Sequence, residues 1–294
     1  MNLNRYMVLE NEKVDLGEYP TRRDAAADRK EIEEKLMTDN LEAMSDLQER
    51  LYADNTYALL IVLQAMDAAG KDGIIKHVMT GLNPQGVKVA SFKVPSSEEN
   101  DHDYLWRIHK AIPPRGEIGI FTRSHYEDVI VARVHDLVRV SQIPGELVGD
   151  DIWDERYAQI RNFETHLAQN GYKIIKFFLH ISQEGQRERL LDRINQEDKH
   201  WKFSSGDIEE RKYWDEYMRA YEIMLQKTST RQSPWYVIPG DNKWFARYLV
   251  SLAVRHALEE INPQYPQLAP AEKDRLAECR ALLESQAPND AKSG

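Results

Sequence analysis

The feature that most limits how this chain can fold is a set of short apolar runs separated by helix-like segments. Residues 57–63, YALLIVL, are apolar without interruption, which is typical of a strand buried on both faces of a parallel sheet. Four further runs have a strand-like character: VKVASFKV (87–94), EIGIFT (117–122), YKIIKFFLHI (172–181) and WYVIP (235–239). Strands that alternate with helices form βαβ units. The sequence therefore predicts an α/β fold, with a parallel sheet of about five strands flanked by helices.

The order of these segments also predicts how the chain is organised. We expect helices at about 72–81, 97–111, 125–135, 150–169, 183–197, 206–227 and 243–261. No low-complexity linker divides the chain, so we expect a single domain over 1–294, with a core at 56–262. Residues 1–55 form a helical N-terminal extension in which 1–20 are loosely held, and 263–294 form a tail with a helix at 271–285. Within the extension, one helical apolar stripe is formed by Leu41, Met44, Leu47 and Leu51.

Charge and composition exclude several classes of partner. The chain has 39 basic and 49 acidic side chains, so its net charge of −10 repels nucleic acid and anionic membranes. The longest apolar run is too short to span a bilayer, and the first residues lack the apolar segment of a secretory signal. The single cysteine, Cys279, excludes an intrachain disulfide. We expect a cytoplasmic protein in which any polyanionic ligand needs a local basic site.

A candidate phosphate loop follows the first strand directly and opens a helix. Residues 64–73, QAMDAAGKDG, contain the Gly70-Lys71 pair of the pattern G-x-x-x-x-G-K-[ST]. Backbone N–H groups at such a helix start bind phosphate oxygens, and Lys71 would neutralise the transferring phosphate. The pattern fails at two positions, where Ala65 replaces glycine and Asp72 replaces the hydroxyl residue. The residues expected to bind nucleotide or phosphate here are Ala68, Ala69, Gly70, Asp72, Gly73 and Lys76.

Asp67 lies inside this phosphate loop, where a carboxylate is unfavourable unless a metal or a proton offsets its charge. One interpretation is that Asp67 holds Mg²⁺, with Mn²⁺ as an alternative, and so replaces the missing hydroxyl. The other interpretation is a solvated turn aspartate, which is common in loops. We favour the metal role because further candidate phosphate-binding residues follow in the chain.

A second group of polar residues follows the strand EIGIFT, in the sequence RSHYEDV (123–129). Ligands of open α/β sheets bind beyond the carboxyl ends of the strands, so this group is placed for binding. Arg123 offers a fork of donors for phosphate and is a catalytic candidate. Asp128 is equally well explained as a helix-starting acid, and His125 is interpreted as structural or substrate-lining. The nucleotide-binding candidates of this group are Ser124, Tyr126, Glu127 and Asp128.

A third group places five cations in a chain that is otherwise acidic. The segment 186–203, QRERLLDRINQEDKHWKF, ends with the aromatic residues Trp201 and Phe203. Such a segment is typical of a mobile lid that clamps a transferring phosphate, although a charged, solvated helix face would have a similar composition. We predict a lid near 183–206 whose polyanion-binding residues are Arg187, Arg189, Arg193, Lys199 and Lys202.

Taken together, these blocks resemble the family-2 polyphosphate kinases. The resemblance is carried, in order from about residue 57 to 255, by QAMDAAGKDGIIKHV, NPQGVKVASFKVP, HDYLWRIHK, FTRSHYEDV, DKHWKFSSGDIEERKYWDEY and SPWYVIPGDNKW. It implies a P-loop kinase-like fold with a helical lid and Mg²⁺-dependent phosphoryl transfer between inorganic polyphosphate and nucleotides. It also implies homo-oligomers, dimers or tetramers, built from dimers.

The family's two Walker patterns map onto this chain with two departures. Its modified Walker A pattern, G-x-D-x-x-G-K-x-G, is matched at Asp67, Gly70, Lys71 and Gly73, with Ala65 in place of the first glycine. The resemblance implies that Asp67 is the metal-linked carboxylate and that Lys71 binds phosphate. The Walker B strand of the family ends in an acidic or amide residue followed by Arg-Ser. Here Thr122 precedes Arg123 and Ser124, which removes one polar group from the site.

The long N-terminal extension and the sequence SHYEDV resemble the third class of the family. Members of that class convert AMP to ADP and ADP to ATP, so we expect adenine nucleotides as substrates, with guanine nucleotides as an alternative. Two other functions fit the same motifs. One is an ATP-dependent nucleoside monophosphate kinase, and the other is a nucleotide-binding regulatory protein without turnover. Donor choice distinguishes the first, and the absence of any transfer distinguishes the second.

Overall fold

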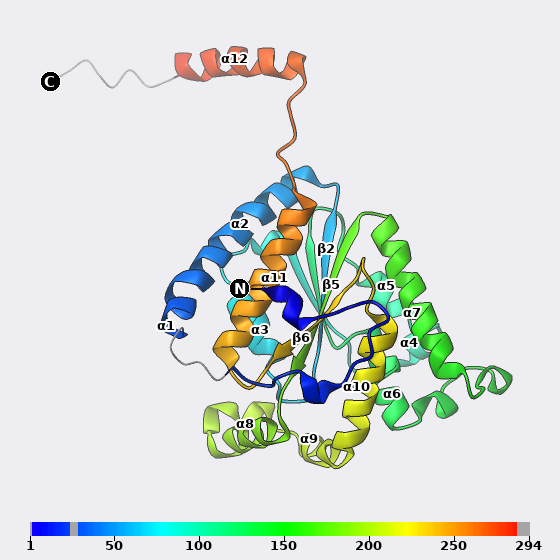
Figure 1. The fold of residues 1–294 in the computed structure, drawn as a ribbon. Helices are drawn as coiled ribbons and strands as arrows, with labels where there is room; N and C mark the ends of the chain where they lie inside the picture. The colour runs from blue at the N-terminus through cyan, green and yellow to red at the C-terminus, as the bar shows by residue number, and fades with distance from the viewer. Residues whose placement is uncertain (1, 24–28, 287–294) are drawn as a thin grey trace.

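The computed structural model describes residues 2–23 and 29–286. Its centre is a six-stranded sheet with the order β1-β6-β5-β2-β4-β3 (Figure 1). The strands are β1 Met7–Val8, β2 Ala58–Gln64, β3 Val87–Ser91, β4 Ile118–Thr122, β5 Tyr172–His180 and β6 Trp235–Pro239. The five longer strands are parallel, and β1 joins β6 in the antiparallel direction. The predicted parallel α/β sheet is therefore confirmed, with one additional short strand.

Helices cover both faces of the sheet and bury every residue of β2. Leu59 and Ile61 point into one core with α2 (Met37–Asp54), α3 (Lys71–Val78) and α11 (Lys243–Ile261). Leu60 and Val62 point into the other core, with α5 (Trp106–Lys110), α7 (Ile152–Gln169) and α10 (Trp214–Thr228). Successive side chains of a strand face opposite sides. The uninterrupted apolar run of β2 therefore supplies both cores.

The remaining elements are short or lie at the edges of these layers. The other helices are α1 Arg29–Glu31, the π-helical turn Ile32–Leu36, α4 Ser97–Asn100, α6 Val131–Val134, α8 Gln183–Asn195, α9 Ser205–Glu210 and α12 Pro270–Ser285. The 3₁₀ turns are Leu3–Tyr6, Leu16–Glu18, Pro84–Gly86, His125–Asp128, Leu137–Val140, Gly145–Leu147, Glu197–Lys202 and Arg211–Tyr213. None of the described helices combines the length and apolar character needed to cross a bilayer.

Some expected elements differ from those observed. The predicted helix 97–111 is divided into α4 and α5, because the Asp103 side chain accepts a hydrogen bond from the Leu105 N–H at 2.9 Å and forms a turn. The prediction that residues 1–20 are loosely held is wrong for the described part of that segment. Leu3, Val8 and Leu16 are buried there. The Ser229 hydroxyl also donates to the Val8 carbonyl at 2.7 Å, which anchors β1.

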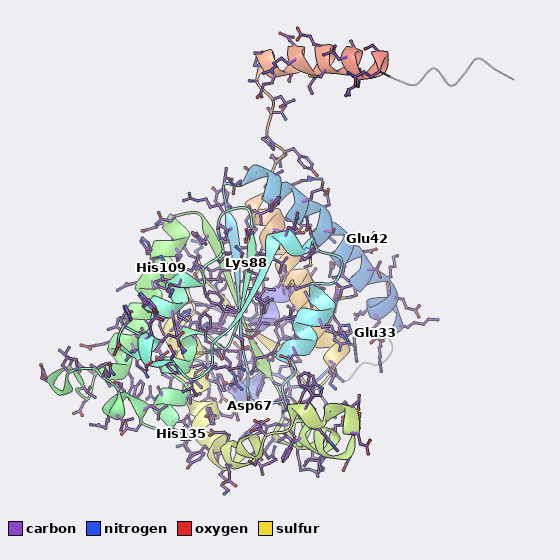
Figure 2. All side chains as sticks on the ribbon, turned by 180° about the vertical axis from the view of Figure 1, so that it is seen from behind. Glu33, Glu42, Asp67, Lys88, His109 and His135 are labelled. Atoms are coloured by element: carbon purple, nitrogen blue, oxygen red, sulfur yellow. The ribbon has the colours of Figure 1, made fainter. Side chains whose placement is uncertain are left out.

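The carboxyl ends of the parallel strands gather at one edge of the sheet. Asp67 lies at this edge near the lid helices, whereas Lys88, at the start of β3, lies toward the opposite end (Figure 2). The loops after β2, β4, β5 and β6 therefore meet at the edge where ligands of such sheets bind.

Candidate active site

The phosphate loop takes its shape from residues with left-handed backbone conformations. Gly70 has a φ of 107° and caps the N-terminus of α3, a conformation that glycine adopts without strain. Ala68 has a φ of 61°, which is uncommon for a residue with a side chain. Strained backbone of this kind gathers at ligand-binding sites. The loop therefore turns tightly between β2 and α3, so that its N–H groups can face a common point.

Lys71 begins α3 and folds back over the loop. Its Nζ donates to the Ala65 carbonyl at 2.8 Å and lies 3.4 Å from the Met66 carbonyl. Burial lowers the pKa of Lys71, and the nearby carboxylates of Asp67 and Glu127 oppose that shift. The ammonium is thus held inside the loop, beside the two acids that stabilise its charge.

Asp67 and Arg123 face each other across the site. Arg123 Nη2 donates to Asp67 Oδ1 at 2.8 Å, and both side chains remain partly exposed to the cleft. Arg123 has a φ of 53°, so the strand end after β4 is also held in a left-handed conformation. The structure thus brings together Asp67, Lys71 and Arg123, the three residues that the sequence predicted as catalytic.

The residues after Arg123 separate into different roles. Ser124 is buried. The Gln64 side-chain amide lies between Ser124 and Glu127: its nitrogen donates to Glu127 Oε1 at 2.9 Å, and its oxygen accepts from the Ser124 N–H at 3.2 Å. Burial raises the pKa of the Glu127 carboxyl, whereas the nearby charges of Lys71 and Arg123 act to lower it. Ser124 therefore fixes the loop from beneath, while Glu127 stays next to the phosphate loop.

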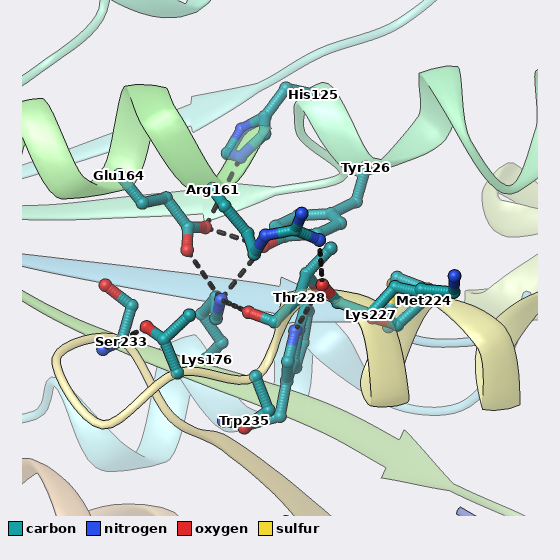
Figure 3. Close-up of polar contacts among 12 residues, drawn as sticks. His125, Tyr126, Arg161, Glu164, Lys176, Met224, Lys227, Thr228, Ser233 and Trp235 are labelled. Atoms are coloured by element: carbon teal, nitrogen blue, oxygen red, sulfur yellow. Dashed lines mark hydrogen bonds and ion pairs between the residues drawn. The ribbon is translucent and has the colours of Figure 1, made fainter. Parts of the chain in front are cut away.

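Tyr126 lies in the core, away from the cleft. Its hydroxyl donates to Glu164 Oε1 at 2.6 Å and accepts from Lys176 Nζ at 2.9 Å (Figure 3). Burial lowers the pKa of the neighbouring His125, which keeps its imidazole neutral. The structure thus places Tyr126 among buried groups that carry the loop. It likewise agrees with the structural interpretation of His125.

Asp128 lines a second cavity of about 650 Å³, together with Arg107 and Arg156. Both arginines are largely buried, and Arg156 stacks over the Tyr104 ring at 4.0 Å. Burial raises the pKa of Asp128 to about 6, while the two arginines favour its charged form. This carboxylate therefore lines a different cavity from Asp67.

The raised pKa of Asp128 predicts a pH-dependent stability. Because its pKa is higher in the folded protein than in the unfolded chain, folding favours the protonated form. The free energy of unfolding should therefore fall by about 3 kcal/mol from this group as pH rises from about 4 through 6. We expect the melting temperature of Asp128→Asn to increase relative to that of the wild type as the pH is raised from 4.5 to 7.5. A difference between the two proteins that does not change with pH would contradict this assignment.

Asp67 and the phosphate loop line the main cleft, which has a volume of about 950 Å³. Six acidic side chains also reach this cleft, but basic residues outnumber them. The basic lining residues are Lys71, Lys76, Lys93, Arg123, Arg189, Arg193, Lys199, Lys202, Lys243 and Arg247. We call this cavity the basic cleft. It is the focused positive site that a polyanion requires in an acidic protein.

Three of these cations were not among the site residues predicted from the sequence. Lys93 follows the end of β3, whereas Lys243 and Arg247 belong to the start of α11, which follows β6. A usable signal existed, because residues after the carboxyl end of any parallel strand reach the binding edge. Thr122, in the Walker B position, also lines the cleft, and its hydroxyl lies 3.4 Å from the Ala90 carbonyl.

The lid segment contacts the phosphate loop directly. Lys202 Nζ lies 3.2 Å from Asp72 Oδ2. Arg193 Nη1 donates to Asp207 Oδ2 at 2.7 Å, and Lys199 lies 3.8 Å from Asp192. Arg187 lies on the exposed side of α8, where it pairs with Glu184. Four of the five predicted lid cations therefore line the basic cleft, whereas Arg187 faces elsewhere.

The donor set near Asp67 suits a hard cation that is shared with a ligand. Among the residues that the structure describes, no cluster of three or more His, Cys, Asp or Glu side chains could hold a metal ion. Mg²⁺ commonly takes only one or two protein carboxylates and completes its shell with water and phosphate oxygens. Asp67 lines the basic cleft as such a carboxylate. The site therefore fits a metal that binds together with the phosphates.

Comparison with known proteins agrees with this geometry. The family model of polyphosphate kinase 2 matches residues 26–267. An ADP-polyphosphate phosphotransferase of Rhodopseudomonas palustris is 49% identical over 95% of this chain and 97% of its own length. An AMP/ADP-polyphosphate phosphotransferase of Meiothermus ruber is 50% identical over 76% of this chain and 80% of its own length.

The solved structures point the same way. The crystal structure of polyphosphate kinase 2 from Arthrobacter aurescens TC1 matches with a TM-score of 0.78 at 39% sequence identity, and covers 90% of this chain and 91% of that chain. The family match, the two relatives and this structure agree with the basic cleft and its phosphate loop. The chain belongs to the polyphosphate kinase 2 family.

Proposed function

We propose that this protein transfers phosphoryl groups from inorganic polyphosphate to AMP and ADP, giving ADP and ATP in a reversible reaction. The observation that carries the proposal is the basic cleft, in which Lys71, Arg123 and the lid cations surround the phosphate loop. The names of the two similar phosphotransferases, one for ADP and one for AMP and ADP, support both acceptors. From the family resemblance we also propose a cytoplasmic homo-oligomer built from dimers.

Phosphoryl transfer depends mainly on positioning the two substrates and on stabilising the charge of the transferring group. The N–H groups of residues 68–72 and Lys71 would hold the phosphates around the transfer point. Arg123, fixed by Asp67 at 2.8 Å, would bind an oxygen of the transferring or the accepting phosphate. When bound at Asp67, Mg²⁺ would neutralise charge on the phosphate oxygens. The lid closes over the cleft and keeps water from the reacting group.

The two cavities suggest different places for the two substrates. Lys243, Arg247 and three cations of the lid segment, Arg193, Lys199 and Lys202, line the basic cleft. Burial, together with the nearby charges of Arg189 and Lys199, lowers the pKa of Lys243. Cations crowded in this way favour a polyanion, so we assign the polyphosphate chain to the basic cleft. The acceptor nucleoside would enter the Asp128 cavity, which adjoins the cleft where Arg107 donates to the Lys93 carbonyl at 2.8 Å.

The experiment supplies purified protein with Mg²⁺, polyphosphate and AMP, without ATP, and follows nucleotides by chromatography and phosphate by ³¹P NMR. Appearance of ADP followed by ATP is the expected result. ADP alone would contradict the second acceptor and keep the donor. Conversion of AMP only when ATP is supplied would overturn the proposal in favour of an ordinary monophosphate kinase, and binding without transfer would favour a regulatory protein.

A further inference from the structure

We propose that Gln186 and Arg189 are positioning residues that hold the peptide groups of the phosphate loop, and that Arg189 is not a ligand of the polyphosphate chain. The inference rests on the proposed function for its kinetic test. It replaces the role that the charge pattern suggested for Arg189. Both residues belong to α8, the first helix of the lid segment.

Side chains of α8 donate hydrogen bonds to the carbonyl oxygens of the phosphate loop. Gln186 Nε2 donates to the Asp67 carbonyl at 2.9 Å. Arg189 Nη1 donates to the Ala69 carbonyl at 2.5 Å and lies 3.3 Å from the Ala68 carbonyl. Lys71 occupies the two preceding carbonyls. Five consecutive carbonyls, from residue 65 to residue 69, therefore have side-chain donors.

Orientation of these carbonyls matters because each peptide group presents an N–H on one side and a C=O on the other. A carbonyl that turned toward the cleft would place a negative oxygen against a phosphate. The Ala68 conformation, with a φ of 61°, also needs outside support, because an alanine held there costs on the order of 1 kcal/mol or more. Donors outside the loop can supply that support by fixing the carbonyls.

The guanidinium of Arg189 donates its hydrogen bonds to backbone carbonyls. Its Nη2 donates to the Gly240 carbonyl and lies 3.2 Å from the Asp241 carbonyl, while Nη1 binds the phosphate loop. Both terminal nitrogens are thus used. One planar fork links the loop after β2 to the loop after β6. Burial lowers the pKa of Arg189, whereas the nearby carboxylates of Asp241 and Glu188 oppose that shift.

The Gln186 side chain is itself fixed by burial and by a second hydrogen bond. Its side chain is fully buried, and its Oε1 accepts from Arg211 Nη1 at 2.7 Å. An uncharged, buried amide is a poor ligand for a polyanion, so its bond to the Asp67 carbonyl has a positioning role. The chain of contacts runs from Arg211 through Gln186 to the backbone of Asp67. Movement of α8 would therefore move the phosphate loop with it.

The test compares Gln186→Met and Arg189→Lys, which keep size or charge but lose the bonds to the loop. We expect kcat with AMP and polyphosphate to fall by about 10- to 100-fold in both, because misplacement of the site by about 1 Å is sufficient for such a loss. KM for polyphosphate should change by less than about threefold. The salt dependence of polyphosphate KM should also keep its slope, because no charge that pairs with the chain is lost. Glu184→Gln, on the exposed side of the same helix, is the matched control and should behave as the wild type.

If Arg189 instead binds polyphosphate, Arg189→Lys should raise that KM while kcat and the Gln186→Met variant stay near wild type. This result would overturn the inference. Amide hydrogen exchange of residues 65–70 provides a readout that does not need turnover. We expect exchange at least tenfold faster in both variants and unchanged in the control, and equal rates in all proteins would also overturn it. A wild type that fails to use polyphosphate counts against the proposed function alone.

Discussion

Asp67→Asn should lower kcat by about two to three orders of magnitude and leave the fold intact. The substitution keeps the shape of the side chain and one oxygen for Arg123, but removes the charge that would hold a divalent cation and orient the guanidinium at 2.8 Å. Steady-state kinetics with AMP and polyphosphate measure the loss. Titration with Mg²⁺ should show that the variant needs a higher metal concentration.

Asp72→Asn is the matched control for this prediction. Asp72 belongs to the same loop, but its side chain is 78% exposed and pairs with Lys202 of the lid. We expect its removal to change kcat by less than about tenfold, because an exposed ion pair contributes little. Near-full activity of Asp67→Asn, or equal losses in the two variants, would contradict the catalytic assignment of Asp67.

Lys176→Met should destabilise the protein by about 3–5 kcal/mol. The Lys176 side chain is fully buried, and its Nζ donates to Glu164 Oε2 at 2.6 Å, to the Tyr126 hydroxyl at 2.9 Å and to the Thr228 carbonyl at 2.8 Å (Figure 3). Removing the ammonium leaves the Glu164 carboxylate buried without its cation. Urea unfolding measures the change, and the melting temperature should fall by about 10 °C.

Two further variants distinguish a buried charge from a general loss of packing. Lys173→Met, on the same strand, removes an amine that pairs with the largely exposed Glu260, and it should cost less than about 1 kcal/mol. The double variant Lys176→Met/Glu164→Leu removes both charges and should recover most of the stability lost by Lys176→Met. A double variant that is less stable than the single one would show that the pair is not the source of the effect.

The sequence predicted those parts of the site that are encoded by position along the chain. A buried strand that runs into Gly70 and Lys71 places a phosphate loop at the sheet edge, and Arg123 follows another strand in the same way. Strand positions and most helices were predictable because apolar runs and helical periodicity are local signals. The two-residue strand β1 was not, since it is too short to show any alternation.

The parts that could not be predicted depend on three-dimensional contacts. Charge alone made Arg189 look like a phosphate ligand, but its direction toward four carbonyls comes from the packing of α8. Tyr126 follows Arg123, which lines the cleft, by three residues, yet its hydroxyl accepts a hydrogen bond from Lys176 in the core. Side-chain direction in a short 3₁₀ turn has no sequence signal. Residue type therefore indicated which side chains could bind phosphate, and packing determined whether each side chain points into the cleft or into the core.

Strand β1 has a consequence for how the chain reaches its final form during synthesis. Met7 and Val8 are made before the other five strands, but they pair with Tyr236 and Trp235 of β6, the last strand of the sheet in chain order. Until β6 has been made, β1 has no partner strand in this sheet. The antiparallel pair closes the β6 edge, where unpaired backbone groups would otherwise recruit strands from other chains. Completion of the sheet and covering of the β6 edge therefore both depend on the synthesis of β6.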